Sequence, residues 1–315
     1  MFKDKRILVT GGRTGFLGVN FVNVLLDMGS LVYAGSLSLT KPSLAPNHPN
    51  LIEYVADLRD NSIPDNIDYI IHCAAHTSGA KEIVGNPAAL IIPNIQLNTN
   101  LLHQAASNGV KKFVFISSSA VYPETCEAVT ENMGFEKDPS DTYFGVGWMK
   151  RYTEKLAEFY YRQYGMEILI IRPSNIYGPY CSFDLERAHV LPALIHKFVE
   201  GQSPIVVWGL PQVSRDFIYV DDFVSGVLRA LEWLVGFDVF NIASGTSYTI
   251  GDAVDLIKEI TNFEGVVLFD STKPMTIYKR VIDTTKASNV LGFLPKTSFK
   301  EGLAKTVDYY KEINT

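Results

Sequence analysis

The chain of 315 residues is poor in cysteine, with only Cys73, Cys126 and Cys181 and no C-x-x-C pair. This scarcity argues against a disulfide framework or a bound metal and fits a reducing compartment, so we expect a cytoplasmic protein. No apolar run approaches the roughly 18 residues of a membrane span. The first expected strand begins at Arg6, which leaves no room for a signal peptide, so we expect no membrane partner.

Positive charge is also scarce. Lys and Arg number 28 against 34 Asp and Glu, the net charge is −6, and basic residues form no block longer than a pair. This balance argues against nucleic acid or an anionic membrane surface as the main partner. Hydrophobic residues make up 47% of the chain, which supports a sizeable core. The length suits one large α/β unit or two modest domains.

The strongest local signal is the stretch I-L-V-T-G-G-R-T-G-F-L-G near the N-terminus. Arg6–Thr10 is predicted as a buried strand, three glycines follow at a spacing of three, and apolar residues at helical spacing follow the glycines. A strand, a glycine turn and a helix in this order form a cradle for a dinucleotide pyrophosphate. The expected cofactor contacts here are Gly12, Arg13, Thr14, Gly15, Phe16 and Leu17, with Gly18 bringing the helix close to the strand.

The expected second strand, Leu31–Ala34, is followed by Gly35 and Ser36, where most dinucleotide folds place an acidic residue. The carboxylate that would repel a 2′-phosphate is therefore missing, and the nearby cations Arg13 and Lys41 could attract one. Ser36 could instead bind a ribose hydroxyl. We favour NAD slightly and leave NADP open.

Strands and helices alternate through the first half of the chain, which predicts a doubly wound parallel sheet. Small residues at the end of the fourth strand, Ala74 and Ala75, suit close passage of a cofactor. Asp57 is either an adenine contact, together with Leu58, or a turn residue. The further strands expected are Leu51–Val55, Tyr69–Cys73, Lys112–Ser117 and Glu167–Arg172, and the helices are Pro93–Asn108, with proline in its first turn, and Trp148–Tyr164.

The rhythm changes at Ser174, where loops lengthen and prolines punctuate them. We therefore divide the chain into a dinucleotide-binding domain, residues 1–173, and a smaller ligand-binding domain, residues 174–315. Residues 212–243 are expected to return to the first domain, because the strand Val239–Ile242 can rejoin its sheet. Further elements expected are Val190–Glu200, Ile205–Trp208, a helix Phe223–Leu234 capped by Asp222, Ile250–Ile260 and Phe299–Ile313.

Six motifs occur in order: T-G-G-R-T-G-F-L-G, H-C-A-A, S-S-S-A-V-Y-P, R-P-S-N-I-Y-G-P, R-D-F-I-Y-V-D-D and L-G-F-L-P-K-T-S-F-K-E-G-L. Over nearly the whole chain they resemble the extended short-chain dehydrogenases/reductases, the nucleotide-sugar epimerase/dehydratase family. Ala188–Leu194, Val206–Gly209 and Tyr160–Gly165 resemble the GDP-fucose synthase-like branch. The resemblance implies a Rossmann-type sheet with a smaller C-terminal α/β substrate domain, and a nicotinamide cofactor that exchanges hydride with a sugar carbon.

The family's usual trio is a Ser or Thr, a Tyr and a Lys, with the last two spaced Y-x-x-x-K on one helix. The tyrosine transfers the hydroxyl proton, and the lysine ammonium lowers the pKa of the tyrosine from about 10 toward neutrality. The resemblance places the serine at Ser118, which could also simply bind backbone, and the lysine at Lys150. Val146 stands in the tyrosine's place, and Tyr143 lies three residues too early.

Two interpretations of this gap remain. Tyr143 can serve only if Asp141–Gly147, with its two glycines, leaves helical geometry and folds back. Otherwise Val146 fills the tyrosine's place and the proton passes to Ser118, His189 or a bound water. We favour the second interpretation slightly, because the chain from Lys150 onward matches the family without a gap.

The resemblance also implies contacts with the substrate. Asn175 and Arg215 match positions that hold the diphosphate, although Arg215 could instead pair with Asp216 at the surface. His189 matches a proton donor of the GDP-fucose synthase-like branch, or is a polar residue that starts a helix. Asn94, Lys150 and Pro173 are further cofactor contacts, and Ser119, Val206, Arg280 and Trp208, the last as pocket wall or core, are further substrate contacts.

These features favour an enzyme that oxidises a nucleotide-diphosphate sugar, expected to be GDP-linked, at C4 with NAD(P). It would stop at the ketone or reduce it with inverted stereochemistry. One alternative is a GDP-fucose-synthase-like epimerase-reductase, although Ala120 replaces that branch's cysteine. Another is a cofactor-binding protein with a degraded catalytic site. The acidic pair of dehydratases is also missing after Ser118, so elimination of water is not expected.

A homodimer is expected, because relatives pair the helices Pro93–Asn108 and Trp148–Tyr164 across a two-fold axis. Both helices carry a second apolar stripe, formed by Leu97, Leu101, Tyr152, Leu156 and Phe159. The alternative is that this stripe is core against the sheet.

Overall fold

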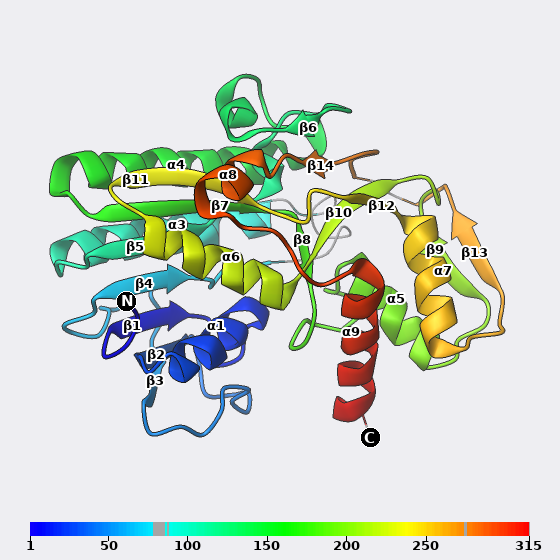
Figure 1. Cartoon of the computed structure of the whole chain (residues 1–315), viewed down its shortest axis with the longest axis horizontal. Helices are drawn as coiled ribbons and strands as arrows, with labels where there is room; N and C mark the ends of the chain where they lie inside the picture. The colour runs from blue at the N-terminus through cyan, green and yellow to red at the C-terminus, as the bar shows by residue number, and fades with distance from the viewer. Residues whose placement is uncertain (78–85, 87, 274–275, 315) are drawn as a thin grey trace.

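The structure, a computed structural model, describes residues 1–77, 86, 88–273 and 276–314. Figure 1 shows a large sheet with helices on both faces and, beside it, a smaller group of helices and short strands in which the chain ends. No helix in these described ranges is long and apolar enough to cross a membrane.

The large sheet has seven strands, all parallel, in the order β11-β7-β5-β4-β1-β2-β3. Its central strands are almost entirely buried, as expected of parallel strands covered on both faces. The strand order reverses between β1 and β4, and doubly wound sheets bind ligands at such a switch point. The strands are β1 (Arg6–Thr10), β2 (Leu31–Ser36), β3 (Leu51–Val55), β4 (Tyr69–His72), β5 (Lys112–Ile116), β7 (Glu167–Pro173) and β11 (Phe237–Ile242).

Helices cover both faces of this sheet (Figure 1). On one face, α1 (Phe16–Asp27), α6 (Val220–Trp233) and α8 (Thr285–Leu291) share a buried apolar cluster with the strands. On the other, α3 (Ala88–Ser107) and α4 (Phe144–Tyr164) pack together over a second cluster. Both faces of the central strands are therefore covered, and the carboxyl ends of the strands remain as the place for a ligand.

The smaller region has an apolar core of its own, to which α5 (Val190–Val199), α7 (Ile250–Thr261) and α9 (Phe299–Ile313) contribute. Short strands complete it. β8 (Asn175–Tyr177), β10 (Ser214–Tyr219) and β12 (Ser247–Thr249) form one sheet, β9 (Ile205–Trp208) pairs with β13 (Val267–Asp270), and β6 (Ala128–Val129) pairs with β14 (Val281–Ile282). One-turn 3₁₀ segments are η1 (Ser119–Val121), η2 (Glu131–Phe135) and η3 (Asp141–Tyr143).

The chain returns to the large sheet from the smaller region, as the strand pattern predicted. β11 pairs with β7, and α6 packs beneath it. β10, in contrast, belongs to the three-stranded sheet of the smaller region, and α8, which follows residue 243, packs against the large sheet. The part of the chain that returns to the first region therefore differs from the expected range, residues 212–243.

Three predicted helix starts are wrong. The helix containing Pro93 begins at Ala88, so the proline lies inside α3 rather than in its first turn. α4 begins at Phe144, four residues earlier than expected, because its two glycines adopt helical geometry. Asp222 does not cap α6, which begins at Val220; its carboxylate instead accepts hydrogen bonds from the backbone N–H groups of Lys296 and Thr297, at 3.0 and 2.9 Å.

Candidate active site

The glycine turn between β1 and α1 leaves no room for side chains. A Cβ at Gly12 would lie 2.8 Å from the carbonyl oxygen of Val9, and one at Gly15 would lie 2.7 Å from that of Gly11. A Cβ at Gly18 would also strike the Gly11 carbonyl. Gly15 is the N-cap of α1 and provides no side-chain cap, so the first N–H groups of this helix are open to a pyrophosphate. The turn therefore fits a dinucleotide.

At the outer edge of the turn, Arg13 is tied down by the protein. Its Nε donates to the Glu53 carboxylate on β3 at 2.8 Å, and an Nη donates to the Lys41 carbonyl at 2.6 Å. Ser36 Oγ, expected to bind a ribose hydroxyl, donates to the Ser38 carbonyl at 2.9 Å. The Arg13 guanidinium is thus held by the protein, whereas Ser36 Oγ can still accept a hydrogen bond.

The contacts of Asp57 fit the second of its two interpretations, a turn residue. Its carboxylate accepts hydrogen bonds from the backbone N–H and the guanidinium of Arg59, at distances from 2.6 to 3.2 Å. The Arg59 hydrogen bond lowers the pKa of Asp57. Leu58 is buried, while Thr14 and Phe16 are half-buried beside the turn.

A buried chain of hydrogen bonds fixes the loop after β4. The Ala74 N–H donates to Thr10 Oγ1 at 2.9 Å, and that hydroxyl lies 2.8 Å from His72 Nδ1. His72 Nε2 lies 2.9 Å from Asn98 Oδ1, which can only accept, so the ring carries its proton on Nε2. Burial lowers the pKa of His72 to about 4, which keeps the ring neutral.

Asn94 holds the next residues of the same loop. Its Oδ1 accepts from the His76 N–H at 2.8 Å, and its Nδ2 donates to the carbonyls of His76 and Leu90, at 2.9 and 2.6 Å. Both N–H groups of the amide are thereby engaged. Asn94 therefore positions the loop that lines the cavity.

Lys150 points from α4 to the end of β5. Its Nζ donates to the Ile116 carbonyl at 2.8 Å and lies 4.7 Å from the centre of the Phe115 ring. Burial lowers the pKa of Lys150 to about 8, against the opposing charge of Glu154. Ser118 Oγ accepts a hydrogen bond from the Ala120 N–H at 3.1 Å, which satisfies its alternative reading but leaves its own proton available for donation.

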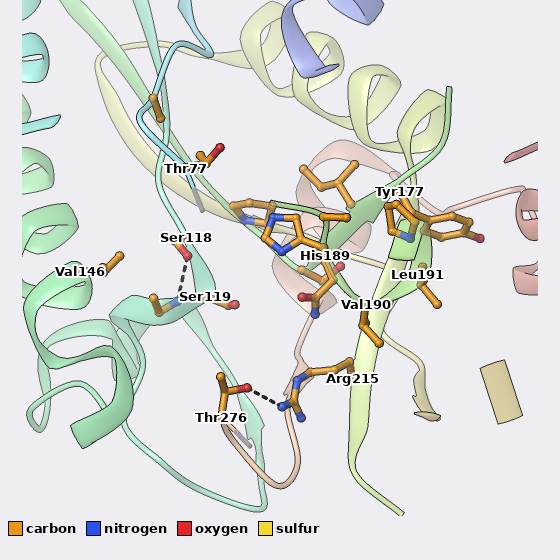
Figure 2. Close-up of a pocket in the computed structure, with 18 of the residues that line it drawn as sticks. Thr77, Ser118, Ser119, Val146, Tyr177, His189, Val190, Leu191, Arg215 and Thr276 are labelled. Carbon is orange, nitrogen blue, oxygen red and sulfur yellow. Dashed lines mark hydrogen bonds between the residues drawn. The ribbon is translucent and has the colours of Figure 1, made fainter. Parts of the chain in front are cut away.

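The segment before Lys150 does not fold back. α4 is helical from Phe144 onward, so Val146 lies one turn before Lys150, and Tyr143 is the N-cap residue, roughly 10 Å from Lys150 along the axis. Val146 and Tyr143 both line the cavity described below. Figure 2 shows Val146 projecting from α4 on the side of the cavity where Ser118 lies.

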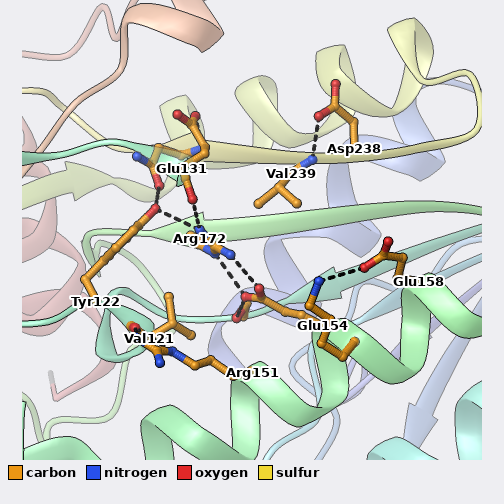
Figure 3. Close-up of polar contacts among 12 residues, drawn as sticks. Val121, Tyr122, Glu131, Arg151, Glu154, Glu158, Arg172, Asp238 and Val239 are labelled. Carbon is orange, nitrogen blue, oxygen red and sulfur yellow. Dashed lines mark hydrogen bonds and ion pairs between the residues drawn. The ribbon is translucent and has the colours of Figure 1, made fainter. Parts of the chain in front are cut away.

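A buried ionic network lies behind these residues (Figure 3). Glu154 and Arg172 each have side chains only 2% exposed and form two hydrogen bonds, of 3.0 and 2.6 Å. Ser117, the neighbour of Ser118, donates to the same carboxylate at 2.5 Å. Arg172 also donates to the Glu131 carbonyl at 2.6 Å and the Tyr122 hydroxyl at 3.3 Å. The network fixes β5, α4 and β7 relative to one another.

The smaller region contributes two guanidinium groups, that of the half-buried Arg215 and that of the buried Arg280. Arg215 donates to Thr276 Oγ1 at 2.9 Å (Figure 2), and Arg280 donates to the Pro123 carbonyl at 2.9 Å. Nε of Arg280 is buried without a partner in the described part of the chain. Burial lowers the pKa of both arginines. The surface pairing of Arg215 with Asp216 is wrong, because that carboxylate is fully buried and accepts from Ser244 and Gly245.

One cavity of about 790 Å³ unites most of the predicted site. Its lining includes Leu17, Ala74, Ala75, Asn94, Ser118, Ser119, Tyr143, Val146, Lys150, Pro173, Asn175, His189, Val206, Trp208, Arg215 and Arg280. The remaining predicted cofactor residues, Gly12, Arg13, Thr14, Gly15, Phe16, Ser36, Asp57 and Leu58, lie outside this lining, at the glycine turn and the ends of β2 and β3.

The cavity lining also contains His76 and Thr77, which the sequence analysis did not name as site residues. They directly follow Ala74 and Ala75, and the signal available in the sequence was a histidine ring just after the end of a strand. His189, the N-cap residue of α5, is exposed and lines the cavity, and desolvation by the protein around it lowers the pKa of its ring. Trp208 is 46% exposed and is therefore wall rather than core.

Comparison with known proteins agrees with this geometry. Residues 7–243 match the NAD dependent epimerase/dehydratase family. The chain is 32% identical over 319 residues to GDP-L-fucose synthase 1 of Arabidopsis thaliana, which covers 98% of this chain and 94% of the relative. The solved UDP-glucose 4-epimerase of Thermotoga maritima, in complex with UDP-glucose, superposes with a TM-score of 0.86 at 30% identity, over 98% of this chain and 100% of that one.

A second solved structure, the UDP-N-acetylglucosamine 4-epimerase of Methanobrevibacter ruminantium, has a TM-score of 0.88 at 28% identity and covers 99% of each chain. The doubly wound fold and the family predicted from the six motifs are confirmed. The chain belongs to the NAD-dependent epimerase/dehydratase family and is an NAD-dependent enzyme of nucleotide-sugar chemistry.

Proposed function

We propose that this enzyme transfers hydride between C4 of a GDP-linked sugar and NAD bound at the glycine turn. It either stops at the ketone or returns the hydride to the opposite face of the sugar. The observation that carries the proposal is the single cavity, which joins Ser118 and Lys150 at the strand ends to Arg215 and Arg280 of the smaller region. Its volume of about 790 Å³ suits a ligand of nucleotide-sugar size.

Bound NAD supplies the hydride acceptor, so the protein has to position the sugar and accept the hydroxyl proton. We assign the hydrogen bond to the reacting oxygen to Ser118, whose own proton remains available. Lys150 provides a positive charge beside this oxygen, which favours loss of its proton. The proton itself passes to water or to His189, because the unbroken helix keeps Val146 in the place where a tyrosine would act.

The two arginines are assigned to the diphosphate. Both guanidinium groups are held by the protein, Arg215 by Thr276 and Arg280 by the Pro123 carbonyl, so little side-chain freedom is lost on binding. Burial has removed much of their hydration, and a diphosphate would restore the missing hydrogen bonds, including one for Nε of Arg280. Asn175, which donates to the Asp216 carbonyl at 3.0 Å, and Ser119 complete this group of proposed contacts.

Guanine is the base we assign to the far end of the cavity. The Trp208 and Val206 side chains on β9 line it, and the Lys273 ammonium lies 5.9 Å from the centre of the Trp208 rings. An exposed tryptophan offers a flat face to a purine. Support for guanine comes from the relative of Arabidopsis thaliana, which is named as a GDP-L-fucose synthase, whereas the two solved structures described above are named for UDP-sugars.

The experiment is incubation of the purified protein, with NAD and then NADH, against GDP-, UDP-, CDP- and dTDP-linked hexoses. Products are identified by mass spectrometry and NMR. Conversion of a GDP-sugar at C4 is expected. Conversion of UDP-sugars alone would contradict the assignment of guanine, and reduction of a 4-keto GDP-sugar without oxidation would favour an epimerase-reductase. Dinucleotide binding with no turnover of any sugar would leave the cofactor-binding protein as the function.

We also propose that the protein is a homodimer through α3 and α4. Tyr152 and Phe159 on α4 are 50% and 49% exposed, and Trp148 adds a third exposed aromatic ring at helical spacing. The prediction that Leu101 belongs to this interface is wrong, because its side chain is fully buried in the core under α3. Leu97 and Leu156 are partly buried against that core.

A further inference from the structure

The edge of the dinucleotide site contains an ion pair that bridges two strands. Arg13 projects from the glycine turn after β1, and its guanidinium is met by the carboxylate of Glu53 on β3 at 2.8 Å. The arginine side chain is 7% exposed and that of Glu53 is 37% exposed, so the carboxylate forms the outer side of the pair.

The loop after β2 encloses this pair. An Nη of Arg13 donates to the Lys41 carbonyl at 2.6 Å, and the Arg13 carbonyl accepts from the Leu44 N–H at 2.9 Å. The neighbouring Ser43 hydroxyl, and then the hydrogen bond and the charge of Arg13, lower the pKa of Glu53, so this carboxylate is ionised at neutral pH. The arginine is therefore held by the loop and by a permanent negative charge.

The position of this pair matters because the end of β2 is where dinucleotide folds distinguish their cofactors. An acidic residue there binds the ribose 2′-hydroxyl of NAD, and an arginine nearby accommodates the 2′-phosphate of NADP. Here β2 ends in Gly35 and Ser36, with no acid, and an arginine is present. β2 itself therefore lacks the acidic residue that usually selects NAD. Glu53 lies beside Ala34 in the register of the sheet, two residues before the end of β2.

We infer that Glu53 gives this site its preference for NAD over NADP, by holding the Arg13 guanidinium in an ion pair at the edge where a 2′-phosphate would need it. The acidic group is thus supplied by the third strand instead of the second. The inference rests on the dinucleotide site of the proposed function, but it concerns cofactor affinity and not the sugar or its turnover.

The charges decide between the two cofactors. A 2′-phosphate brings close to two negative charges to this edge. It has to compete with the Glu53 carboxylate for the Arg13 guanidinium, and the same carboxylate repels it. Asp57 at the end of β3 already occupies the guanidinium of Arg59, so that cation is engaged as well. A ribose hydroxyl is neutral and requires neither arginine to move.

The test is calorimetric titration of the nucleotide-free protein with NAD and with NADP, in the absence of any sugar. Glu53→Gln keeps the size of the side chain and removes its charge. We expect its Kd for NADP to fall by about tenfold, the effect of one newly available charge-assisted hydrogen bond, while the Kd for NAD changes by less than about threefold. An unchanged ratio of the two Kd values would overturn the inference.

Two further variants make the result specific. Arg13→Met combined with Glu53→Gln removes the group that the glutamate restrains, so the gain in NADP affinity should disappear; a gain that persists would show that Arg13 is not the group involved. Glu259→Gln is the matched control. Glu259 lies on the distant helix α7 and is also an exposed glutamate in an ion pair, with its carboxylate 2.6 Å from the ammonium of Lys300. Its Kd ratio should equal that of the parent protein. If the parent protein binds neither dinucleotide, the proposed function fails first, and separately.

Discussion

Removing the charge of Glu154 should destabilise this protein far more than removing the charge of Glu158, one turn later on the same helix. The Glu154 carboxylate accepts two hydrogen bonds from Arg172 and one from Ser117, and both ionic side chains are 2% exposed. Glu158 pairs with Lys155 and Arg162, whose side chains are 60% and 69% exposed. Figure 3 shows both glutamates on α4.

The magnitude follows from these contacts. Hydrogen bonds to charged groups contribute about 1.5 to 3 kcal/mol each, so the three bonds of Glu154 set an upper bound of several kcal/mol. Breaking a buried pair from one side leaves an uncompensated charge and costs about 3 to 5 kcal/mol, which is the loss expected for Glu154→Gln. Glu158→Gln should lose less than about 1 kcal/mol, because its pairs are exposed to solvent.

The assay is equilibrium unfolding in urea, followed by circular dichroism. At an m-value of about 3 kcal/mol/M, Glu154→Gln should lower the midpoint by about 1 M or more with m unchanged. A loss below about 1 kcal/mol, or one equal to that of Glu158→Gln, would refute the reasoning. Replacing both partners, as in Glu154→Leu with Arg172→Met, should cost less than the single change, because no buried charge is left behind.

Four further predictions concern the active site, the pH dependence of stability and the assembly. Tyr143→Phe should lower the rate of hydride transfer in single-turnover measurements by less than about tenfold, because Tyr143 precedes α4 and lies roughly 10 Å from Lys150 along the helix axis. A hundredfold loss would make Tyr143 the base. Val146→Tyr should raise the rate if the site only lacks the hydroxyl. The pKa of His72 is about 4 in the folded state and about 6.5 in the unfolded state, so the unfolded state binds the proton first and the free energy of unfolding falls as the pH drops from 6.5 to 4. His72→Gln should remove about 3 kcal/mol of that loss, measured by urea titrations at the two pH values. Tyr152→Lys with Phe159→Lys should give a monomer by sedimentation at micromolar concentration, and a parent protein already monomeric there would disprove the dimer.

The sequence by itself determined the elements whose signals are local. β1, the glycine turn and α1 were predicted because a Cβ in the turn collides with backbone only a few residues away, so the requirement for glycine appears in neighbouring residues. Strands β3 and β9 and helix α9 were predicted with their observed bounds, since their apolar periodicity needs no knowledge of the fold. Six motifs in order were enough to identify the family.

The ionic partners were decided only by the tertiary structure. Glu53 lies 40 residues from Arg13, and Glu154 lies 18 residues from Arg172, and no local pattern links them. The packing of strands side by side brings such groups together, and desolvation then makes the pairing obligatory. The same packing placed Leu101 in the core, although its helical spacing equally suited an exposed stripe.

The interpretation of the missing tyrosine depended on both the sequence and the tertiary structure. The sequence established that Val146 stands four residues before Lys150, but it left open whether two glycines would bend the chain and bring Tyr143 back. The structure continues α4 through Gly145 and Gly147, because both are packed too closely for a side chain: a Cβ at Gly145 would lie 2.6 Å from Ile91 Cδ1, and one at Gly147 would lie 2.5 Å from the Ala120 carbonyl oxygen. These glycines are needed for contact with α3 and η1, a reason that lies in the neighbouring elements and is invisible in the segment itself.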